Sequence, residues 1–244
     1  MPRFFVSPEA ICDGQITVTG DDARHIARSL RMAVGDEVTL SDGLGVEYSC
    51  RLTKIRDEEC TAEVLSFEKS KREPTHPVTL YMAYPKGDKL ETVVQKSVEL
   101  GASHIVPFES ERCIKRPAPE KAEKQTARLQ RIADEAAKQC GRGILPTVHT
   151  PVSFGAMLDM MAKHSLVLFC YEKEDTTTIR AALENATGLS DLAVIVGAEG
   201  GFSEKEAAAI VDKGAKCVSL GPRILRCETA PDYALAVISC FLEL

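Results

Sequence analysis

Two short stretches in the last fifth of the chain combine glycines with charged side chains in a way that suits ligand binding. Residues 197–201 read Gly-Ala-Glu-Gly-Gly and lie between an apolar run and a predicted helix. Glycines let the backbone turn sharply and approach a ligand closely. No Gly-Lys-Ser/Thr follows, so this is not a phosphate-binding P-loop. The Glu199 carboxylate favours a cationic or zwitterionic ligand, although an ordinary tight turn also fits the pattern.

The second stretch, residues 220–231, places Arg226 and Glu228 between an apolar run and an apolar predicted helix. This position predicts that both charged side chains are partly buried. Buried charges are costly unless they are paired or used. One interpretation is a structural Arg226–Glu228 pair, with Glu228 also favoured at a helix N-terminus. The other is a catalytic pair at the mouth of a ligand pocket.

The elements that must position these stretches alternate between strand and helix from residue 77 onward. The pattern predicts strands at 78–83, 105–108, 166–171, 192–196 and 217–220, and helices at 88–100, 120–140, 203–213 and from about 229. Asp88 with Glu91, and Ser203 with Glu206, have the spacing of a capping box. Such alternation predicts an α/β domain with a mostly parallel sheet, whose ligands bind beyond the carboxyl ends of the strands.

The first seventy residues have a different pattern. Short β-like runs at 37–40 and 48–52 flank Asp42-Gly43, which indicates a hairpin, and one short helix fits 21–30. A polar segment ending at Pro74 suits a linker. We therefore expect a small, mostly β barrel over residues 1–72 and an α/β domain over residues 73–244.

Composition narrows the class of protein. The 244 residues are 44% hydrophobic and 27% charged, which is ordinary for a soluble globular protein. No apolar run reaches the length of a membrane span, and the N-terminus lacks the features of a secretory signal, so we expect a cytoplasmic protein that does not bind membranes. The nine cysteines form no C-x-x-C pair and the five histidines form no H-x-x-x-H pair. Reduced thiols and no metal site are expected.

Positive charge is concentrated in one segment. The net charge of −6 argues weakly against a nucleic-acid partner, but residues 112–142 contain nine Lys or Arg against four Asp or Glu. On a helix over 120–140, basic side chains share one face and apolar ones the adjacent face. The basic positions are 121, 124, 128, 131 and 138. This face is either a solvated surface or a ridge that contacts phosphates.

At the two glycine-containing stretches the chain resembles a known family. It is similar to the RsmE family, SPOUT-class methyltransferases that modify N3 of a uridine in 16S ribosomal RNA of the small subunit. The matching segments are residues 3–5, 25, 30–31, 35–36, 85–89 (Pro-Lys-Gly-Asp-Lys), 95–96, 99–101, 110–113, 139–142, 199–203 (Glu-Gly-Gly-Phe-Ser) and 220–226. The chain departs from the family pattern at Ala198, where proline is usual, and at Cys227, where threonine is usual.

The resemblance implies a fold and a set of functional residues. The C-terminal domain should be a SPOUT-type trefoil knot, a rare exception to unknotted topology, and the N-terminal domain a PUA-like barrel that grips RNA. The protein should be a homodimer that binds S-adenosylmethionine through three loops. The expected cofactor-binding residues are Leu168, Tyr171, Glu172, Gly197, Glu199, Gly200, Gly201, Leu220, Gly221, Arg223, Ile224 and Leu225.

The same resemblance directs the mechanistic hypothesis. N3 of uracil carries a proton, so a catalyst must remove it or stabilise the resulting anion. Arg226 is expected to supply a cation and Glu228, or a water that it orders, to act as base. The target base must leave its stack to reach the site. Candidate RNA contacts are Arg3, Arg24, His25, Arg28, Arg31, Lys86, Arg112, Lys115 and Arg142.

Three alternatives stay open at this stage. The first is an RNA-binding ribosome assembly factor without catalysis, which needs no intact glycine stretch. The second is a doubly wound enzyme that uses a nucleotide, which needs a phosphate fingerprint that the sequence lacks. The third is a knotted methyltransferase that acts on another RNA, such as transfer RNA or the large ribosomal subunit. Residue types do not separate the third from the main hypothesis, because RNA readout depends on shape and unstacked bases.

Overall fold

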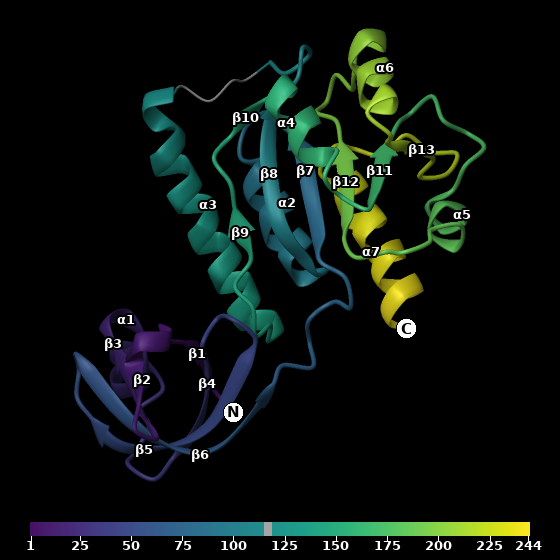
Figure 1. Cartoon of the computed structure of the whole chain (residues 1–244). Helices are drawn as coiled ribbons and strands as arrows, with labels where there is room; N and C mark the ends of the chain where they lie inside the picture. The colour runs from purple at the N-terminus through teal and green to yellow at the C-terminus, as the bar shows by residue number, and fades with distance from the viewer. Residues whose placement is uncertain (115–118) are drawn as a thin grey trace. The chain divides into compact units, whose positions relative to one another are not determined.

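The computed structural model describes residues 1–114 and 119–244 (Figure 1). The chain divides into two compact units. The first consists of residues 1–73 and 137–145, and the second of residues 74–136 and 146–244. We expected one division of the chain after residue 72, but residues 137–145 also belong to the first unit. No sequence pattern indicates this.

The first unit is built on a curled six-stranded sheet, drawn in purple and blue in Figure 1. The strand order is β1 (Arg3–Phe5), β4 (Glu37–Ser41), β5 (Val46–Ile55), β6 (Glu59–Lys69), β3 (Gln15–Thr19) and β2 (Ile11–Cys12). Only β1 and β4 pair in parallel. Register shifts in the β5–β6 pair mark the bulges that let such a sheet bend. The inner face carries an apolar core that includes Ile16, Val38, Leu40 and Leu52.

The predicted local features of this unit are confirmed. Asp42 and Gly43 lie in the turn between β4 and β5, where Asp42 Oδ1 accepts hydrogen bonds from the amides of Leu44 and Val46 at 2.8 and 3.0 Å. The predicted helix begins as α1 (Gly20–Arg24) and continues into a single π-helical turn, η2 (His25–Ser29). A short 3-10 turn, η1 (Pro8–Ala10), joins β1 to β2.

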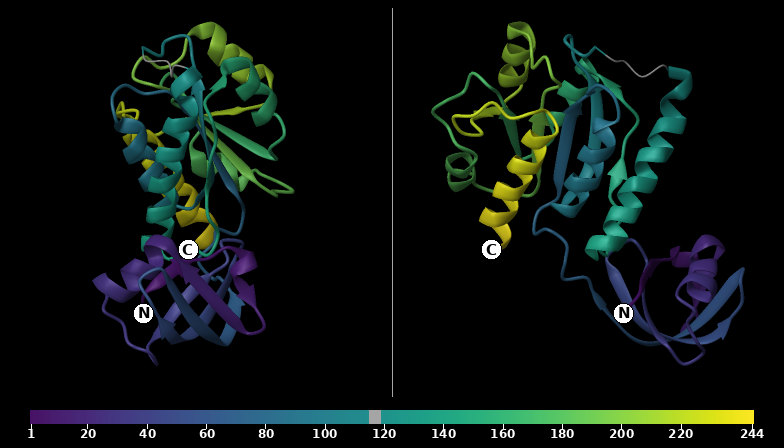
Figure 2. Two further views of the ribbon diagram at one scale, coloured as in Figure 1. Left: turned by 90° about the vertical axis from the view of Figure 1, so that its left-hand side faces the viewer. Right: turned by 180° about the vertical axis from the view of Figure 1, so that it is seen from behind.

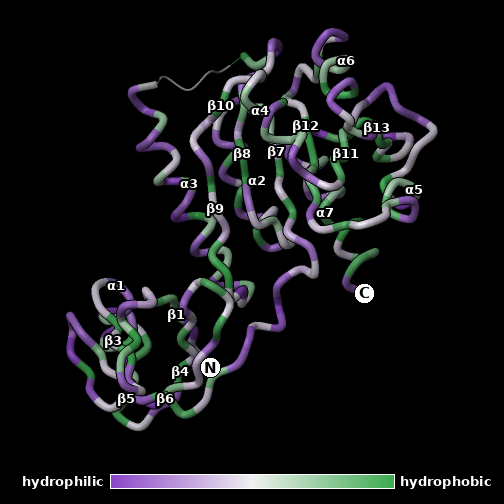
Figure 3. Tube along the Cα trace, in the orientation of Figure 1, coloured by the Kyte–Doolittle hydropathy of each residue, from purple (hydrophilic) through white to green (hydrophobic). Residues whose placement is uncertain are grey.

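The second unit is a parallel sheet covered by helices (Figures 1 and 2). The strand order is β10 (Val152–Ser153), β8 (Ala102–Glu109), β7 (Val78–Ala83), β12 (Leu192–Val196), β11 (Leu166–Cys170) and β13 (Lys216–Val218), with β9 (Thr147–Val148) also paired to β8. All of these pairs are parallel, which confirms the predicted α/β class. Strands β7, β11 and β12 are buried along their whole length, and β11 and β12 are apolar throughout (Figure 3).

The helices of this unit are α2 (Lys89–Glu99), α3 (Pro119–Cys140), α4 (Phe154–Met161), α5 (Ile179–Glu184), α6 (Glu204–Asp212) and α7 (Thr229–Glu243). Ser203 and Glu206 form the predicted capping box at the start of α6. The capping box predicted for Asp88 and Glu91 is wrong. Asp88 occupies the N-cap position of α2, but its side chain makes no capping hydrogen bond, and Glu91 pairs instead with Arg128 at 2.9 Å.

Candidate functional site

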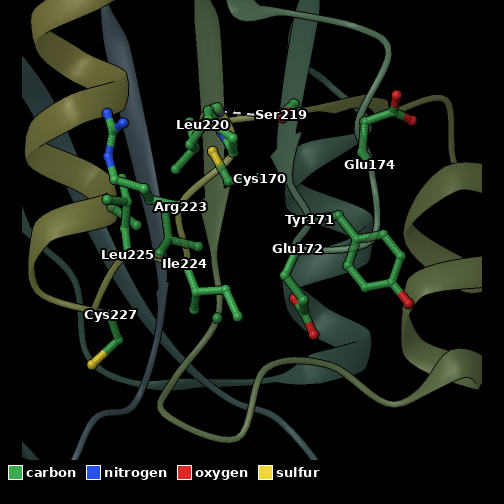
Figure 4. Close-up of a pocket in the computed structure, with 15 residues that line it drawn as sticks. Cys170, Tyr171, Glu172, Glu174, Ser219, Leu220, Arg223, Ile224, Leu225 and Cys227 are labelled. Atoms are coloured by element: carbon green, nitrogen blue, oxygen red, sulfur yellow. Dashed lines mark hydrogen bonds between the residues drawn. The ribbon is translucent and has the colours of Figure 1, made fainter.

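A pocket opens at the carboxyl ends of β11, β12 and β13, where parallel α/β sheets usually bind ligands. Because these strands run in parallel, the loops that follow them emerge at one edge of the sheet. The lining residues come from these three loops and the start of α7: Cys170, Tyr171, Glu172, Glu174, Val196, Gly197, Ser219, Leu220, Gly221, Pro222, Arg223, Ile224, Leu225, Cys227 and Ala230. The structure thus brings residues fifty positions apart into one concave surface (Figure 4).

Eight of the twelve expected cofactor-binding residues line this pocket, namely Tyr171, Glu172, Gly197, Leu220, Gly221, Arg223, Ile224 and Leu225. Leu168 does not, because it is fully buried inside β11. Glu199, Gly200 and Gly201 belong to the right loop but are not part of the lining. Cys227, which lies in the stretch singled out from the sequence, also lines the pocket. Sequence patterns did not indicate Glu174 or Ser219, since their places depend on how the loops fold back.

Glycines shape the loop after β12 for packing reasons. A Cβ atom at Gly197 would lie 2.9 Å from Cε2 of Phe202, and one at Gly201 would lie 2.8 Å from Oε1 of Glu172. Gly201 also has a φ of +61°, which favours glycine. The amide of Gly201 donates to the carbonyl of Ala198 at 3.0 Å, so this turn closes by a backbone hydrogen bond without the proline usual in the family.

Beside the pocket, one lysine holds two carboxylates. Lys89, the first residue of α2, places Nζ 3.0 Å from Oε1 of Glu199 and 3.1 Å from Oε2 of Glu228. Cys227 donates its thiol to Oε2 of Glu228 at 3.2 Å. The backbone amide of Lys86 also donates to Glu199 at 3.3 Å. Three separate chain segments therefore meet at the Lys89 ammonium.

These contacts set the ionisation of the cluster. The hydrogen bonds of Lys89 with Glu199 and then with Glu228 raise the pKa of that lysine above its ordinary value. Burial alone would raise the pKa of each glutamate. For Glu199, hydrogen bonds from Lys89 and from backbone amides outweigh burial and lower its pKa. For Glu228, a backbone amide, the Cys227 thiol and then Lys89 do the same. Burial, followed by the hydrogen bond to Glu228, raises the pKa of the Cys227 thiol to about 12. At neutral pH the cluster holds one ammonium, two carboxylates and a neutral thiol.

The two expected catalytic residues have different surroundings. Glu228 is half-buried and tied to Lys89, as described above. Arg226 is exposed, so the prediction that it is partly buried is wrong, and the structural Arg226–Glu228 pair is not formed. Within the described residues, the Arg226 side chain makes no hydrogen bond or ion pair. Its neighbours Leu225 and Cys227 both line the pocket, which puts Arg226 at the pocket rim.

The expected RNA-contacting residues fall into two groups. Arg3 and Arg142 are engaged inside the first unit, with Arg3 bound to Glu47 and Arg142 to Glu73, each at 2.8 Å. Arg142 is 3% exposed, so the expectation that it contacts RNA is corrected to a structural ion pair. The others are more accessible. Arg24 and Arg28 form ion pairs near the surface, His25, Arg31, Lys86 and Arg112 are exposed, and Lys115 lies outside the described residues.

Arg112 also supports the glycine loop. Its guanidinium donates to the carbonyl of Gly200 at 3.0 Å, and a Cβ atom at Gly200 would lie 2.9 Å from the Cβ of Arg112. Among the residues that the structure describes, no helix is both long and apolar enough to cross a membrane. The same residues contain no group of three or more His, Cys, Asp or Glu side chains arranged to hold a metal ion.

Comparison with known proteins extends these observations. Residues 71–239 match the model of an RNA methyltransferase domain, and residues 18–65 match that of an RNA methyltransferase PUA domain. The chain is 34% identical over 234 residues to ribosomal RNA small subunit methyltransferase E of Bacillus subtilis, covering 93% of this chain and 91% of that protein. It is 35% identical over 242 residues to the protein of the same name from Synechocystis, covering 99% of this chain and 78% of that protein.

Solved structures give the same result. The chain matches the ribosomal RNA small subunit methyltransferase E of Neisseria gonorrhoeae, a structure bound to S-adenosyl methionine, with a TM-score of 0.86 and 32% identity over 98% of this chain and 97% of that one. It also matches a Legionella pneumophila methyltransferase in complex with bound cofactor SAM, with a TM-score of 0.85 and 30% identity over 98% and 96% of the two chains. The chain therefore belongs to the RNA methyltransferase family that includes ribosomal RNA small subunit methyltransferase E.

Proposed function

We propose that this protein methylates N3 of a specific uridine in 16S ribosomal RNA of the small subunit, with S-adenosylmethionine as methyl donor. The observation that carries the proposal is the pocket at the strand ends, with eight expected cofactor-binding residues on its wall. Its agreement with the family match over residues 71–239 adds support. The proposed site of action is the cytoplasm, where small ribosomal subunits assemble.

The chemistry of the pocket fits S-adenosylmethionine. Glu172 and Glu174 offer negative charge to a cationic donor, and Arg223 offers positive charge to a carboxylate. Ile224 lines the pocket and is 92% exposed, so an apolar group has a surface to cover. In Figure 4, Tyr171 and Glu172 lie on the side of the pocket opposite Arg223, Ile224 and Leu225. When bound, this donor supplies an electrophilic methyl carbon on a sulfonium.

The residues at the rim then act on the base. Arg226 is placed to stabilise the negative charge that spreads over the uracil oxygens when N3 loses its proton. Glu228, ionised at neutral pH, accepts that proton directly or through an ordered water. The loops exclude water and align the acceptor, which removes much of the barrier by positioning alone. These roles for Arg226 and Glu228 belong to the proposal.

The proposed active form is a homodimer built on a trefoil-knotted C-terminal domain. Helix α7 supplies the best candidate surface, because Tyr233, Ala236, Cys240 and Phe241 are exposed on one side of an otherwise apolar helix. Tyr233, Ala236 and Cys240 are spaced by three and four residues, and Phe241 follows Tyr233 by eight, so the four share one side of the helix. An exposed apolar stripe of this kind is typical of a protein interface.

The proposal is tested by incubating the purified protein with tritiated S-adenosylmethionine and three RNA substrates from a strain that lacks this activity. The substrates are small ribosomal subunits, large ribosomal subunits and transfer RNA. Label confined to the small subunit is the expected result. Label in another RNA would support the alternative methyltransferase substrate. Cofactor binding without label in any of them would favour the non-catalytic assembly factor.

A further inference from the structure

Lys89 lies where a cation is locally unfavourable. It is the first residue of α2, and the N-terminus of a helix carries a partial positive charge that disfavours lysine. The side chain is only 34% exposed, so it gives up much of its hydration. Two carboxylates offset this cost, each within 3.1 Å of Nζ. Lys89 is thus unfavourable at the start of the helix, yet it makes two close contacts with carboxylates. This combination suggests that Lys89 has a role other than stabilising α2.

The two carboxylates come from two different loops beside the pocket. Glu199 belongs to the loop after β12, two residues beyond the lining residue Gly197. Glu228 follows the lining residue Cys227 and immediately precedes α7. The Lys89 ammonium therefore forms ion pairs with both the loop that contains the glycines and the loop that contains Arg226.

We infer that Lys89 is a positioning residue for methyl transfer, which holds the 197–203 loop and the 226–228 segment in one arrangement around the donor pocket. This inference rests on the proposed function for its kinetic consequence, but the two ion pairs are a property of the free protein. Without Lys89, two neighbouring carboxylates face each other with no cation between them. Like charges repel, so the two segments that carry these carboxylates move apart.

The kinetic consequence is a loss of alignment and not of RNA binding. A misplacement of about 1 Å can cost on the order of a hundredfold in rate. In Lys89→Met we expect kcat for methyl transfer to fall about a hundredfold, while KM for the RNA changes less than threefold. Lys89→Arg keeps the cation and should recover at least a tenth of the wild-type kcat.

The acid side of the pH–rate profile gives a second signature. Glu199 and Glu228 face Lys89, the Cys227 thiol and backbone amides. Against the effect of burial, Lys89 contributes to lowering the pKa of both carboxyls, together with backbone amides and, for Glu228, the Cys227 thiol. Removing Lys89 raises their pKa values. The rate should therefore begin to fall at a higher pH in Lys89→Met than in the wild-type protein, as pH decreases through the raised pKa of Glu228.

The deciding experiment is amide hydrogen exchange on the full chain, without RNA or donor, in the wild-type protein, Lys89→Met, Lys89→Arg and the control Lys163→Met. Lys163 is an exposed lysine just after α4. We expect at least tenfold faster exchange in both 197–203 and 226–232 for Lys89→Met alone, with partial recovery in the double variant Lys89→Met/Glu199→Gln, which relieves the repulsion. Unchanged protection in both segments, or faster exchange throughout the second unit, would overturn the inference.

This measurement separates the inference from the proposed function. A wild-type protein that labels no RNA contradicts the proposed function, yet leaves the exchange result valid. A wild-type protein that methylates uridine, with a Lys89→Met variant of unchanged kcat and unchanged exchange, contradicts the inference alone.

Discussion

Gly197 leaves no room for a side chain. A Cβ atom there would press on the ring of Phe202, which is buried and packs edge-to-face against Phe169 at 5.0 Å between ring centroids. We expect Gly197→Ala to lower the free energy of unfolding by about 1–3 kcal/mol through overpacking. Because Gly197 lines the pocket, affinity for S-adenosylmethionine should also fall at least tenfold, measured by calorimetry.

A matched control is available in α4. A Cβ atom at Gly155 would have no neighbour within 4 Å, and its φ is ordinary. Gly155→Ala should therefore leave cofactor affinity unchanged and raise the free energy of unfolding by about 0.5–1 kcal/mol, as expected for alanine in a helix. Equal loss of affinity in the two variants would show that the crowding at Gly197 is not what shapes the pocket.

Arg226, the proposed source of positive charge for the uracil anion, is exposed. It sits at the pocket rim without a protein partner among the described residues, so its removal should not disturb the fold. We expect Arg226→Ala to abolish methylation while affinity for S-adenosylmethionine stays within several-fold of wild type. Arg180→Ala, an exposed arginine of α5, serves as control and should retain full activity. Equal loss of methylation and cofactor affinity would make Arg226 a cofactor-binding or folding residue.

Single residues also show where sequence patterns stop being informative. Gly197, Arg223 and Glu228 stand out because their types are unusual beside apolar strands. Lys89 does not stand out, since one lysine in a Lys-Gly-Asp-Lys run looks like ordinary helix-start surface. Its two partners lie 110 and 139 residues away in sequence, and only the parallel sheet brings them together. The ion pair of Arg142 with Glu73 is also hidden from sequence patterns, because the two residues are 69 positions apart and meet only where residues 137–145 join the first unit.

Helix α3 carries several basic side chains on its surface. Lys121, Lys124 and Arg131 are exposed and line a groove together with residues 87, 88, 90 and 91 at the start of α2. In the described residues these three side chains have no ion-pair partner, whereas Arg128 pairs with Glu91. Arg128 is therefore partly neutralised, and the other three basic side chains are the ones available to RNA phosphates.

Neutralising these three positions should change the salt dependence of RNA binding. We expect the triple variant Lys121→Gln, Lys124→Gln and Arg131→Gln to reduce the slope of log K against log salt by about two, since each phosphate contact contributes roughly 0.7 to 0.9. Filter binding of RNA across a series of salt concentrations measures this slope for each variant. The control carries Lys163→Gln, Lys205→Gln and Lys216→Gln, which remove the same charge elsewhere on the second unit. An equal change of slope in both variants would indicate that the basic side chains of α3 are solvated and do not contact RNA phosphates.

Most elements of the second unit were predictable because their signals are strong and local. Five apolar runs became strands, and Gly101 and Gly214, with φ of +94° and +97°, follow α2 and α6. The helices α4 and α5 were missed because they are short, with eight and six residues, and lack a long amphipathic period. The Asp88 capping box failed because Glu91 makes a stronger, charged contact with Arg128.

At the scale of the whole molecule, the apolar face of α7 is the feature that a monomer does not explain. Tyr233 and Phe241 are 42% and 39% exposed, eight residues apart on one side of the helix. We expect the protein to run at twice the mass of its 26.6 kDa chain in light scattering after size exclusion. Phe241→Asp should shift it to the monomer mass, because a charge in an apolar interface is costly.

The control for the dimer places the same charge on another exposed apolar residue. Val211 lies in α6 and is 44% exposed. Val211→Asp should leave the dimer intact. A wild-type protein at the mass of a single chain over micromolar concentrations would contradict the proposed homodimer, and so would loss of the dimer in both variants.

The central claim is that this chain attaches a methyl group to N3 of one uridine in 16S ribosomal RNA. The most direct measurement is nuclease digestion and mass spectrometry of 16S RNA from small subunits incubated with the protein and deuterated S-adenosylmethionine. We expect one deuterated N3-methyluridine at a single position, absent when the Arg226→Ala variant is used. A deuterated methyl group on another atom or another base, or none from a protein that binds the donor, would contradict it.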